Sequence, residues 1–227
     1  MSVSIGSLTE PTSFLQAIKD PSWNQAMELE FVALQHNKTW HLIPSSSSGK
    51  VIGCKWVYKL KLQPDGQIER YKALLVAKGY HQTEGIDYFE TFSSVVKPPT
   101  IRIVLSLALS QNWCIRQPDV HNAFLHGNLA KDVFMEQPPG FVDPLYPTHV
   151  FKLDKSLYGL KQSPRAWYTK LSTFLLHLGF VTSKNDSSLF ICHSSHWLLL
   201  VLVYVDDIII TGSHSTQVTH LIQQLYH

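Results

Sequence analysis

The sequence predicts an α+β fold, because helical and strand patterns alternate irregularly and hairpins stand among them. The clearest hairpin runs from Lys55 to Leu62, where residues alternate in character, turns at Pro64-Asp65-Gly66, and returns over Ile68 to Lys78. Further segments follow the same periodicities. Helices are expected at 21–34, 100–111, 166–178 and 218–225, and strands at 113–120, 189–192 and 198–212.

Length and composition indicate a globular protein. The 227 residues are 44% hydrophobic and 16% charged, which is too apolar for disorder. The formal net charge of +2 gives no general attraction to nucleic acid, so any basic surface must be local. The three cysteines are far apart and show no zinc spacing, which predicts a reduced, intracellular protein. No signal peptide or membrane segment is expected, since Asp206 and Asp207 interrupt the most apolar stretch.

The predicted hairpin carries a row of cations. A period of two residues puts Arg70, Lys72 and Lys78 on one face of the return strand, with Leu74 and Val76 between them. This face is either a solvated polar surface or a basic flap over phosphates, and the pattern alone leaves both interpretations open.

The candidate chemistry lies in the acidic pair Asp206 and Asp207, which stands between two apolar runs. Burying unpaired charge costs on the order of several kcal/mol, so the pair needs compensation. A turn at a hairpin tip, a salt-bridged pair and a divalent-cation site are the alternatives, and this segment alone favours the turn. Asp119, at the end of a predicted strand, shifts the balance towards metal, because two-metal phosphoryl transfer needs such a carboxylate cluster.

Ordered motifs along the chain resemble the reverse transcriptase of copia-type LTR retrotransposons. The resemblance runs from about Trp23 to the last residue. The matching runs are IGCKWVYK at 52–59, ERYKA at 69–73, LVAKGY at 75–80, GIDY at 85–88 with ETFS at 90–93, NAFLHG at 122–127, SLYGLKQSPRAWY at 156–168 and YVDDIIITG at 204–212.

The resemblance implies a right-hand polymerase fold with fingers and palm only. Fingers would come from about 22–95 and 126–157, and the palm from about 96–125 and 158–227. The palm would be an antiparallel sheet backed by helices, and the thumb would be missing. Residues 1–21 would be a flexible lead-in to a truncated reverse transcriptase domain at 22–227.

Site residues follow from the same resemblance. The catalytic, metal-binding carboxylates would be Asp119, Asp206 and Asp207, holding two Mg²⁺ ions, with Mn²⁺ as the alternative. Phe124 would either lie beneath the incoming sugar or simply pack in the core, and the backbone of His121 to Phe124 would approach the triphosphate. The implied nucleotide-binding residues are Arg70, Lys72, Phe124, Tyr158 and Gly159; those for template and primer are Lys161, Gln162, Pro164, Arg165 and Tyr204.

The implied function is RNA-directed DNA polymerisation on a primed RNA or DNA template, with deoxynucleoside triphosphates. The intact polyprotein would continue into a thumb and a ribonuclease H region, and would act in cytoplasmic particles, with the nucleus as the alternative. The competing hypothesis is a truncated, non-catalytic relic that at most binds nucleic acid. Leu74 and Pro118, which replace an arginine and an apolar residue of the family, favour reduced activity, while Ser94 and Asn128 are milder departures.

Overall fold

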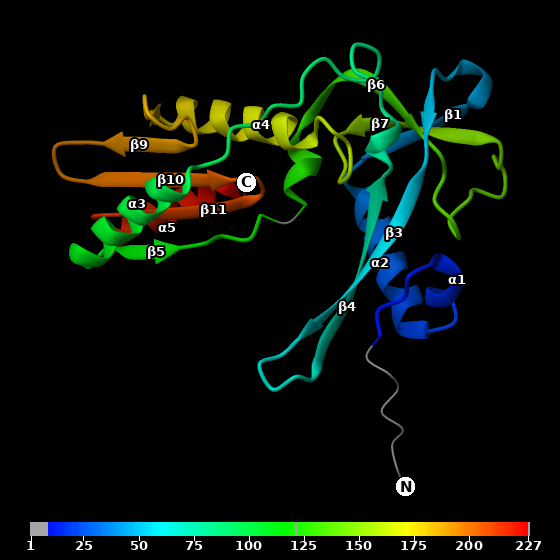
Figure 1. Ribbon diagram of the computed structural model, residues 1–227, viewed down its shortest axis with the longest axis horizontal. Coiled ribbons are helices and arrows are strands. Elements are labelled where there is room, and N and C mark those ends of the chain that lie inside the picture. The colour runs from blue at the N-terminus through cyan, green and yellow to red at the C-terminus, as the bar shows by residue number, and fades with distance from the viewer. Residues whose placement is uncertain (1–8, 121, 227) are drawn as a thin grey trace, which may run out of the picture. The chain divides into compact units, whose positions relative to one another are not determined.

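The computed structural model describes residues 9–120 and 122–226 (Figure 1). The chain forms two compact units. The first unit comprises the residues up to Phe89 together with Leu129–Lys161, and the second comprises Glu90–Asn128 together with the residues from Gln162 onward. The borders at 89, 129 and 161 lie near the borders of 95, 126 and 157 that the resemblance implies for fingers and palm.

The first unit combines a helix with a long two-stranded ribbon and a four-stranded sheet. Asp20 caps α2, because its carboxylate accepts a hydrogen bond from the Ser22 N–H at 2.8 Å, and Pro21 occupies the first turn. The sheet has the order β1-β7-β6-β2. The elements are α1 (Phe14–Ala17), α2 (Pro21–His36), β1 (Trp40–Pro44), η1 (Ser45–Ser47), β2 (Val51–Ile52), β3 (Cys54–Leu62), β4 (Ile68–Ala77), η2 (Gly79–His81), β6 (Asn128–Met135) and β7 (His149–Lys155).

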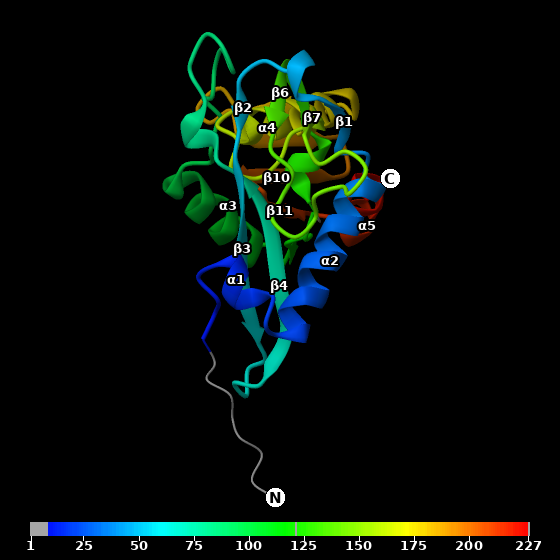
Figure 2. The ribbon, with the colours of Figure 1, turned by 90° about the vertical axis from the view of Figure 1, so that its right-hand side faces the viewer.

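The predicted hairpin is confirmed as the ribbon of β3 and β4. Trp56 and Tyr58 are buried, while Lys55 and Val57, which alternate with them, are exposed, as the pattern requires. Figure 2 shows α2 running alongside β4, and the Trp23 ring of α2 packs edge-on against Tyr58 at 5.3 Å between centroids. Aromatic packing therefore fixes the helix against the ribbon.

The described part of the expected lead-in contacts distant parts of the first unit. The Glu10 carboxylate accepts a hydrogen bond from the Leu60 N–H at 3.0 Å and lies 3.3 Å from the Lys59 ammonium. The Phe14 ring of α1 packs so closely on Gly140 that a Cβ there would lie 2.6 Å from it. Residues 1–8 lie outside the described part, and the flexibility of the lead-in stays a prediction.

The second unit is an antiparallel sheet of order β5-β11-β10-β9-β8 with helices packed on it. On one face, Val104 of α3 packs with Leu200 and Leu202 of β10. On the other, Tyr168 of α4 lies 6.3 Å from the ring of Phe190. The elements are α3 (Pro98–Ser110), β5 (Cys114–Arg116), η3 (Ala123–His126), α4 (Ser163–His177), β8 (Val181–Thr182), β9 (Leu189–His193), β10 (Leu198–Tyr204), β11 (Asp207–Gly212) and α5 (Ser215–Leu225).

The mixed α+β class is confirmed, with differences in single elements. The strand expected at 113–120 spans only Cys114–Arg116 and ends two residues before Pro118, which has no backbone N–H to donate to a ladder. Strands β1, β2, β6 and β7 lack a clear alternation in the sequence and were not expected. Within the ranges 9–120 and 122–226, no helix is both long and apolar enough to cross a membrane.

A buried aspartate links α3 to the loop before β9. Asp186 is 6% exposed, and one of its carboxylate oxygens accepts hydrogen bonds from the Lys97 N–H at 2.9 Å and the Thr100 hydroxyl at 2.6 Å. The Ser188 N–H donates to the other oxygen at 3.1 Å. Burial by itself would raise the pKa of Asp186, but these hydrogen bonds and the Lys97 charge outweigh it and lower the pKa below its ordinary value.

We expect Asp186→Asn to lower the free energy of unfolding by about 1–3 kcal/mol at neutral pH, because an amide cannot replace a carboxylate among these donors. The folded-state pKa lies below the unfolded-state pKa. The carboxylate therefore stabilises the fold above the unfolded pKa, and this stabilisation is lost as pH falls through the folded pKa. Urea denaturation of the parent chain and of Asp186→Asn over a pH series measures the difference between their free energies of unfolding. Asp132→Asn, which removes an exposed carboxylate, is the control. If the stability lost in Asp186→Asn did not depend on pH, the stabilising role of the Asp186 carboxylate would be contradicted.

Candidate functional site

The acidic pair lies at the tip of a hairpin between two inner strands. Tyr204, the last residue of β10, pairs with Asp207, the first residue of β11, so that Val205 and Asp206 form a two-residue turn. Tyr204 is 51% exposed, Asp207 is exposed, and Asp206 is half-buried. The turn expected from the sequence is confirmed, and it holds two neighbouring carboxylates on a rigid support.

The turn has a strained backbone and a fixed carbonyl. Val205 has φ of 56°, in the left-handed region that a β-branched residue rarely adopts, at a cost of about 1–3 kcal/mol. The Trp167 indole N–H of α4 donates to the Val205 carbonyl at 3.0 Å. Sequence reasoning missed this contact, because helical spacing marks Trp167 only as a core position.

Asp119 follows β5, the strand beside β11. Arg116 lies opposite Ile210, and the same register continued would bring Asp119 opposite Asp207. The ladder instead ends at Arg116, and the Gln117 side-chain amide donates to the Asp207 carboxylate at 3.1 Å. Among the described residues, which include all three aspartates, no three His, Cys, Asp or Glu side chains lie close enough together to hold a metal ion. The hard oxygen ligands suit Mg²⁺, but the three-carboxylate site stays a prediction.

Phe124 lies in the short helix η3 and is 7% exposed. Its neighbours Ala123 and Leu125 are buried as well, and Asn122 before them has φ of 54°. This burial favours the packing role that the sequence left open, while contact with a sugar stays a prediction. His121, whose backbone was expected near the triphosphate, lies outside the described residues.

The exposed face of the β3–β4 ribbon carries cations from both strands. Lys59 lies directly opposite Lys72, and Lys61 lies directly opposite Arg70. Directly opposed residues share one face, where like charges repel and destabilise the pair. All of these side chains are exposed, and Leu74 lies half-buried on the same face. An anion bound here would relieve the repulsion.

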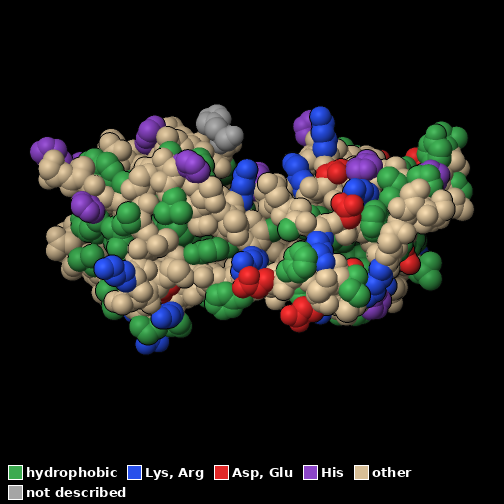
Figure 3. Space-filling model, turned by 90° about the horizontal axis from the view of Figure 1, so that it is seen from above, with side chains coloured by type: hydrophobic (Ala, Val, Ile, Leu, Met, Phe, Trp, Pro, Cys, Tyr) green, Lys and Arg blue, Asp and Glu red, His purple; other side chains and the backbone are tan. Residues whose placement is uncertain are grey.

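One face of the molecule shows no comparable order. On the face of the molecule shown in Figure 3, Lys and Arg side chains are scattered among apolar and acidic ones. This agrees with the formal net charge of +2. The opposed pairs on the ribbon are therefore a local arrangement.

Two titratable groups lie near the ribbon. Burial raises the pKa of Glu30 on α2, although a hydrogen bond from the Leu75 N–H and the Lys72 charge oppose the rise. Burial, with the Glu136 carboxylate nearby, raises the pKa of the Cys54 thiol to about 12. Cys54 is therefore protonated at neutral pH and unsuited to nucleophilic catalysis.

Two glycines interlock the 156–161 loop with the end of β4. The Ala77 N–H donates to the Tyr158 carbonyl at 2.8 Å. A Cβ on Gly159 would lie 2.1 Å from the Ala77 oxygen, and one on Gly79 would lie 2.0 Å from the Gly159 oxygen. Gly159 also has φ of 90°, which favours glycine. Tyr158 and Gly159 thus lie at the end of the strand that carries Arg70 and Lys72.

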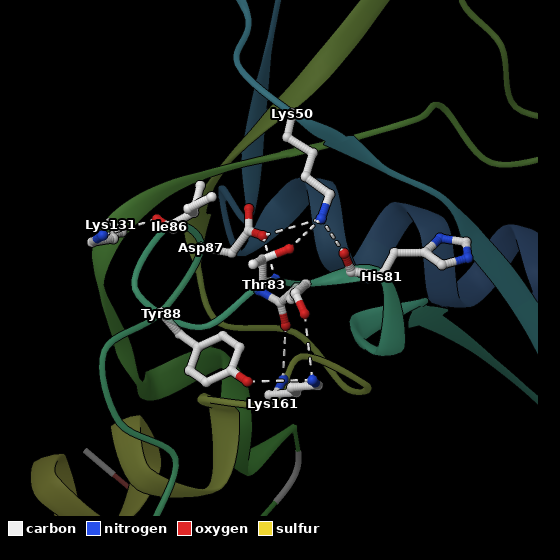
Figure 4. Close-up of polar contacts among 9 residues, drawn as sticks. Lys50, His81, Thr83, Ile86, Asp87, Tyr88, Lys131 and Lys161 are labelled. Atoms are coloured by element: carbon white, nitrogen blue, oxygen red, sulfur yellow. Dashed lines mark hydrogen bonds and ion pairs between the residues drawn. The ribbon is translucent and has the colours of Figure 1, made fainter.

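Lys161 belongs to a group of three lysines that hold the 81–88 loop (Figure 4). Its backbone N–H donates to the Gln82 side chain at 2.9 Å, and its ammonium donates to the Tyr88 hydroxyl at 3.3 Å. Lys50 donates to the Thr83 hydroxyl at 2.8 Å, and Lys131 donates to the Ile86 carbonyl at 2.9 Å. The Lys161 ammonium therefore has partners within the first unit, and its contact with a template stays a prediction.

Arg165 joins the start of α4 to the segment 90–93. Its guanidinium lies 2.7 Å from the Glu90 carboxylate and donates to the Phe92 carbonyl at 3.0 Å. The Ser93 hydroxyl donates to the Pro164 carbonyl. Pro164 and Gln162 are both half-buried. These contacts give Arg165 a structural use, and the template roles of Gln162, Pro164 and Arg165 stay predictions.

Comparisons with known proteins agree with the sequence motifs. The family model described as reverse transcriptase (RNA-dependent DNA polymerase) matches residues 37–227. The chain is 49% identical over 226 residues to the retrovirus-related Pol polyprotein from transposon RE1 of Arabidopsis thaliana, covering 99% of this chain and 15% of that protein. It is 42% identical over 207 residues to the corresponding polyprotein from transposon TNT 1-94 of Nicotiana tabacum, covering 89% of this chain and 16% of that protein.

A shorter relative matches more closely over fewer residues. The uncharacterized mitochondrial protein AtMg00820 of Arabidopsis thaliana is 54% identical over 113 residues, which cover 47% of this chain and 66% of that protein. The present chain spans about 15% of the length of the transposon polyproteins. The expected resemblance to copia-type Pol polyproteins is confirmed, and the chain belongs to the reverse transcriptase (RNA-dependent DNA polymerase) family.

Proposed function

We propose that this chain is the fingers and palm of an RNA-directed DNA polymerase, with the first unit as fingers and the second as palm. The observation that carries the proposal is the pair Asp206 and Asp207, held at the tip of two inner strands of an antiparallel sheet. Nucleotidyl transfer requires carboxylates fixed in place, and a hairpin between inner strands provides such a support.

Asp206 and Asp207, joined by Asp119, would hold two Mg²⁺ ions, with Mn²⁺ as the alternative. The ions would supply activation of the attacking 3′ oxygen and stabilisation of the departing pyrophosphate. Completing this group requires Asp119 to approach the pair. Asp119 follows the end of β5 and precedes η3, in a segment outside the helices and strands, and the proposal therefore requires a change of backbone in this segment.

The cationic face of the ribbon would meet the phosphates of the nucleotide. Arg70 and Lys72 supply the charge, while Tyr158 and Gly159 lie at the end of the same strand. Template and primer would be bound through their phosphates, independently of sequence. The proposed contacts are Lys161, Gln162, Pro164, Arg165 and Tyr204.

The biological setting is also a proposal. As part of a polyprotein, the chain would continue into a thumb and a ribonuclease H region and act in cytoplasmic particles, with the nucleus as the alternative. The second candidate function is a non-catalytic relic that binds nucleic acid through its fingers. One observation favours this candidate. Among the described residues, Asp119 and the acidic pair do not form a group that could hold a metal ion.

Primer extension on an RNA template with Mg²⁺ tests the proposed activity. We expect Asp206→Asn and Asp207→Asn each to reduce extension at least about 100-fold, the scale on which loss of one transition-state electrostatic partner acts. Asp132→Asn, an exposed carboxylate on β6, is the matched control and should extend primers like the parent chain. Salt-sensitive binding of RNA without any extension would contradict the polymerase and support the relic.

The cationic ribbon predicts a gain of function. Leu74→Arg should tighten binding of a primed RNA template, because it adds a guanidinium to the face of Arg70 and Lys72. The slope of log affinity against log salt concentration should steepen by about 0.7–0.9, the value for one further phosphate contact. Leu145→Arg, at a side chain that is 81% exposed in a loop of the first unit, is the control. Equal changes in the two variants would show that the ribbon has no special role.

A further inference from the structure

The turn between β10 and β11 adopts a backbone conformation that its sequence disfavours. The first residue of such a two-residue turn has positive φ, and glycine is the usual residue there. This chain instead has Val205 at φ of 56°, a branched side chain in the left-handed region. Such a conformation persists only where neighbouring groups hold it.

Trp167 contacts the backbone of this turn. The side chain is 5% exposed, and its indole N–H donates to the Val205 carbonyl at 3.0 Å. An indole has a single N–H donor and accepts nothing in return, so a buried tryptophan needs one well-placed acceptor. The Val205 carbonyl is that acceptor, one peptide bond away from Asp206.

The helix that presents Trp167 is anchored to the segment 90–93. Arg165, two residues before Trp167, pairs with Glu90 at 2.7 Å. The position of α4 therefore sets the position of the indole, and the indole hydrogen bond in turn sets the position of the Val205 carbonyl.

Trp167 also contacts the segment that contains Phe124. Its ring lies 5.9 Å from the His126 ring, and α4 packs against η3. One buried side chain thus contacts both the acidic turn and the η3 segment. Both segments are predicted to act on the incoming nucleotide, so their relative placement within the second unit depends on this contact.

We propose that Trp167 is a positioning residue, whose indole N–H holds the strained Val205 turn and thereby orients the Asp206 and Asp207 carboxylates. The inference deepens the proposed polymerase function and rests on it. Trp167 touches no reacting atom; it acts through the turn.

Trp167→Phe removes the N–H and keeps an aromatic ring in the core. A misplacement of about 1 Å in a reacting site can cost on the order of 100-fold in rate, so we expect kcat for primer extension to fall about 10- to 100-fold. KM for the deoxynucleotide should change less than about threefold, because the cations of the ribbon are untouched. Tyr168→Phe is the matched control: it removes a hydroxyl of the same helix that donates to the Ser187 carbonyl at 2.7 Å, away from the acidic turn, and it should leave kcat unchanged.

A binding measurement separates this inference from the polymerase proposal. Mn²⁺ titration, followed by electron paramagnetic resonance of the free ion, reports the carboxylates without any turnover. Trp167→Phe should weaken Mn²⁺ binding about tenfold while Tyr168→Phe does not. In the parent chain labelled with ¹⁵N-tryptophan, Mn²⁺ should broaden the Trp167 indole resonance more than the other five.

The strain itself supplies a second test. Val205→Gly lets the turn adopt positive φ without the branched side chain. In that background, the added effect of Trp167→Phe on Mn²⁺ binding should shrink to less than about threefold, since the two residues act through one conformation.

The outcomes are distinct. Weaker Mn²⁺ binding in Trp167→Phe alone, with no primer extension by any variant, supports the positioning role and overturns the polymerase. Primer extension and Mn²⁺ binding that are the same in Trp167→Phe and Tyr168→Phe overturn the positioning role and leave the polymerase standing. A parent chain that binds no Mn²⁺ overturns the positioning role as well, because the turn would then orient no metal-binding carboxylates.

Discussion

The pairing of β10 with β11 is the constraint on which the candidate site depends. Leu199 to Tyr204 pair residue by residue with Asp207 to Gly212, and the flanking strands pair with the half of the hairpin away from its tip, β9 with Leu198–Leu202 and β5 with Ile210–Gly212. Its side chains are apolar and buried on both faces, so the position of the tip is set by packing. The acidic pair stands where that packing ends, which is why two neighbouring carboxylates can be held rigidly and still reach solvent.

The β3–β4 ribbon of the first unit likewise combines a packed base with exposed charged side chains. Packing of Trp23 on Tyr58 and the interlock of Gly79 with Gly159 fix the base of a long two-stranded element, while its cations are left exposed. Opposed like charges such as Lys61 and Arg70 lower the stability of the free protein. At the next opposed pair, Lys59 and Lys72, the Glu10 carboxylate lies 3.3 Å from Lys59 and offsets part of the repulsion, and a bound anion would offset more of it.

Strong periodicity explains what could be predicted from the sequence. The β3–β4 ribbon and α4 have complete alternation or a full apolar stripe, and both were found close to their observed bounds. Strands such as β6 and β7 lack a regular alternation of apolar and polar residues, so their pairing with other strands decides their structure. The family and the acidic turn were also accessible, because motif residues such as Asp206 and Asp207 are adjacent in sequence.

Contacts between distant residues could not be predicted in this way. The sequence could neither show that the Trp167 indole reaches Val205, nor that Arg165 pairs with Glu90 and Lys161 with the 81–88 loop. The early end of β5, by contrast, has a cause in the sequence, because Pro118 has no backbone N–H to donate to a ladder that would bring Asp119 level with Asp207. The most direct measurement is a crystal structure of the chain with Mn²⁺ and a deoxynucleoside triphosphate. The account predicts anomalous Mn²⁺ density ligated by Asp119, Asp206 and Asp207 together; Mn²⁺ density elsewhere, or at the turn without Asp119, would contradict it.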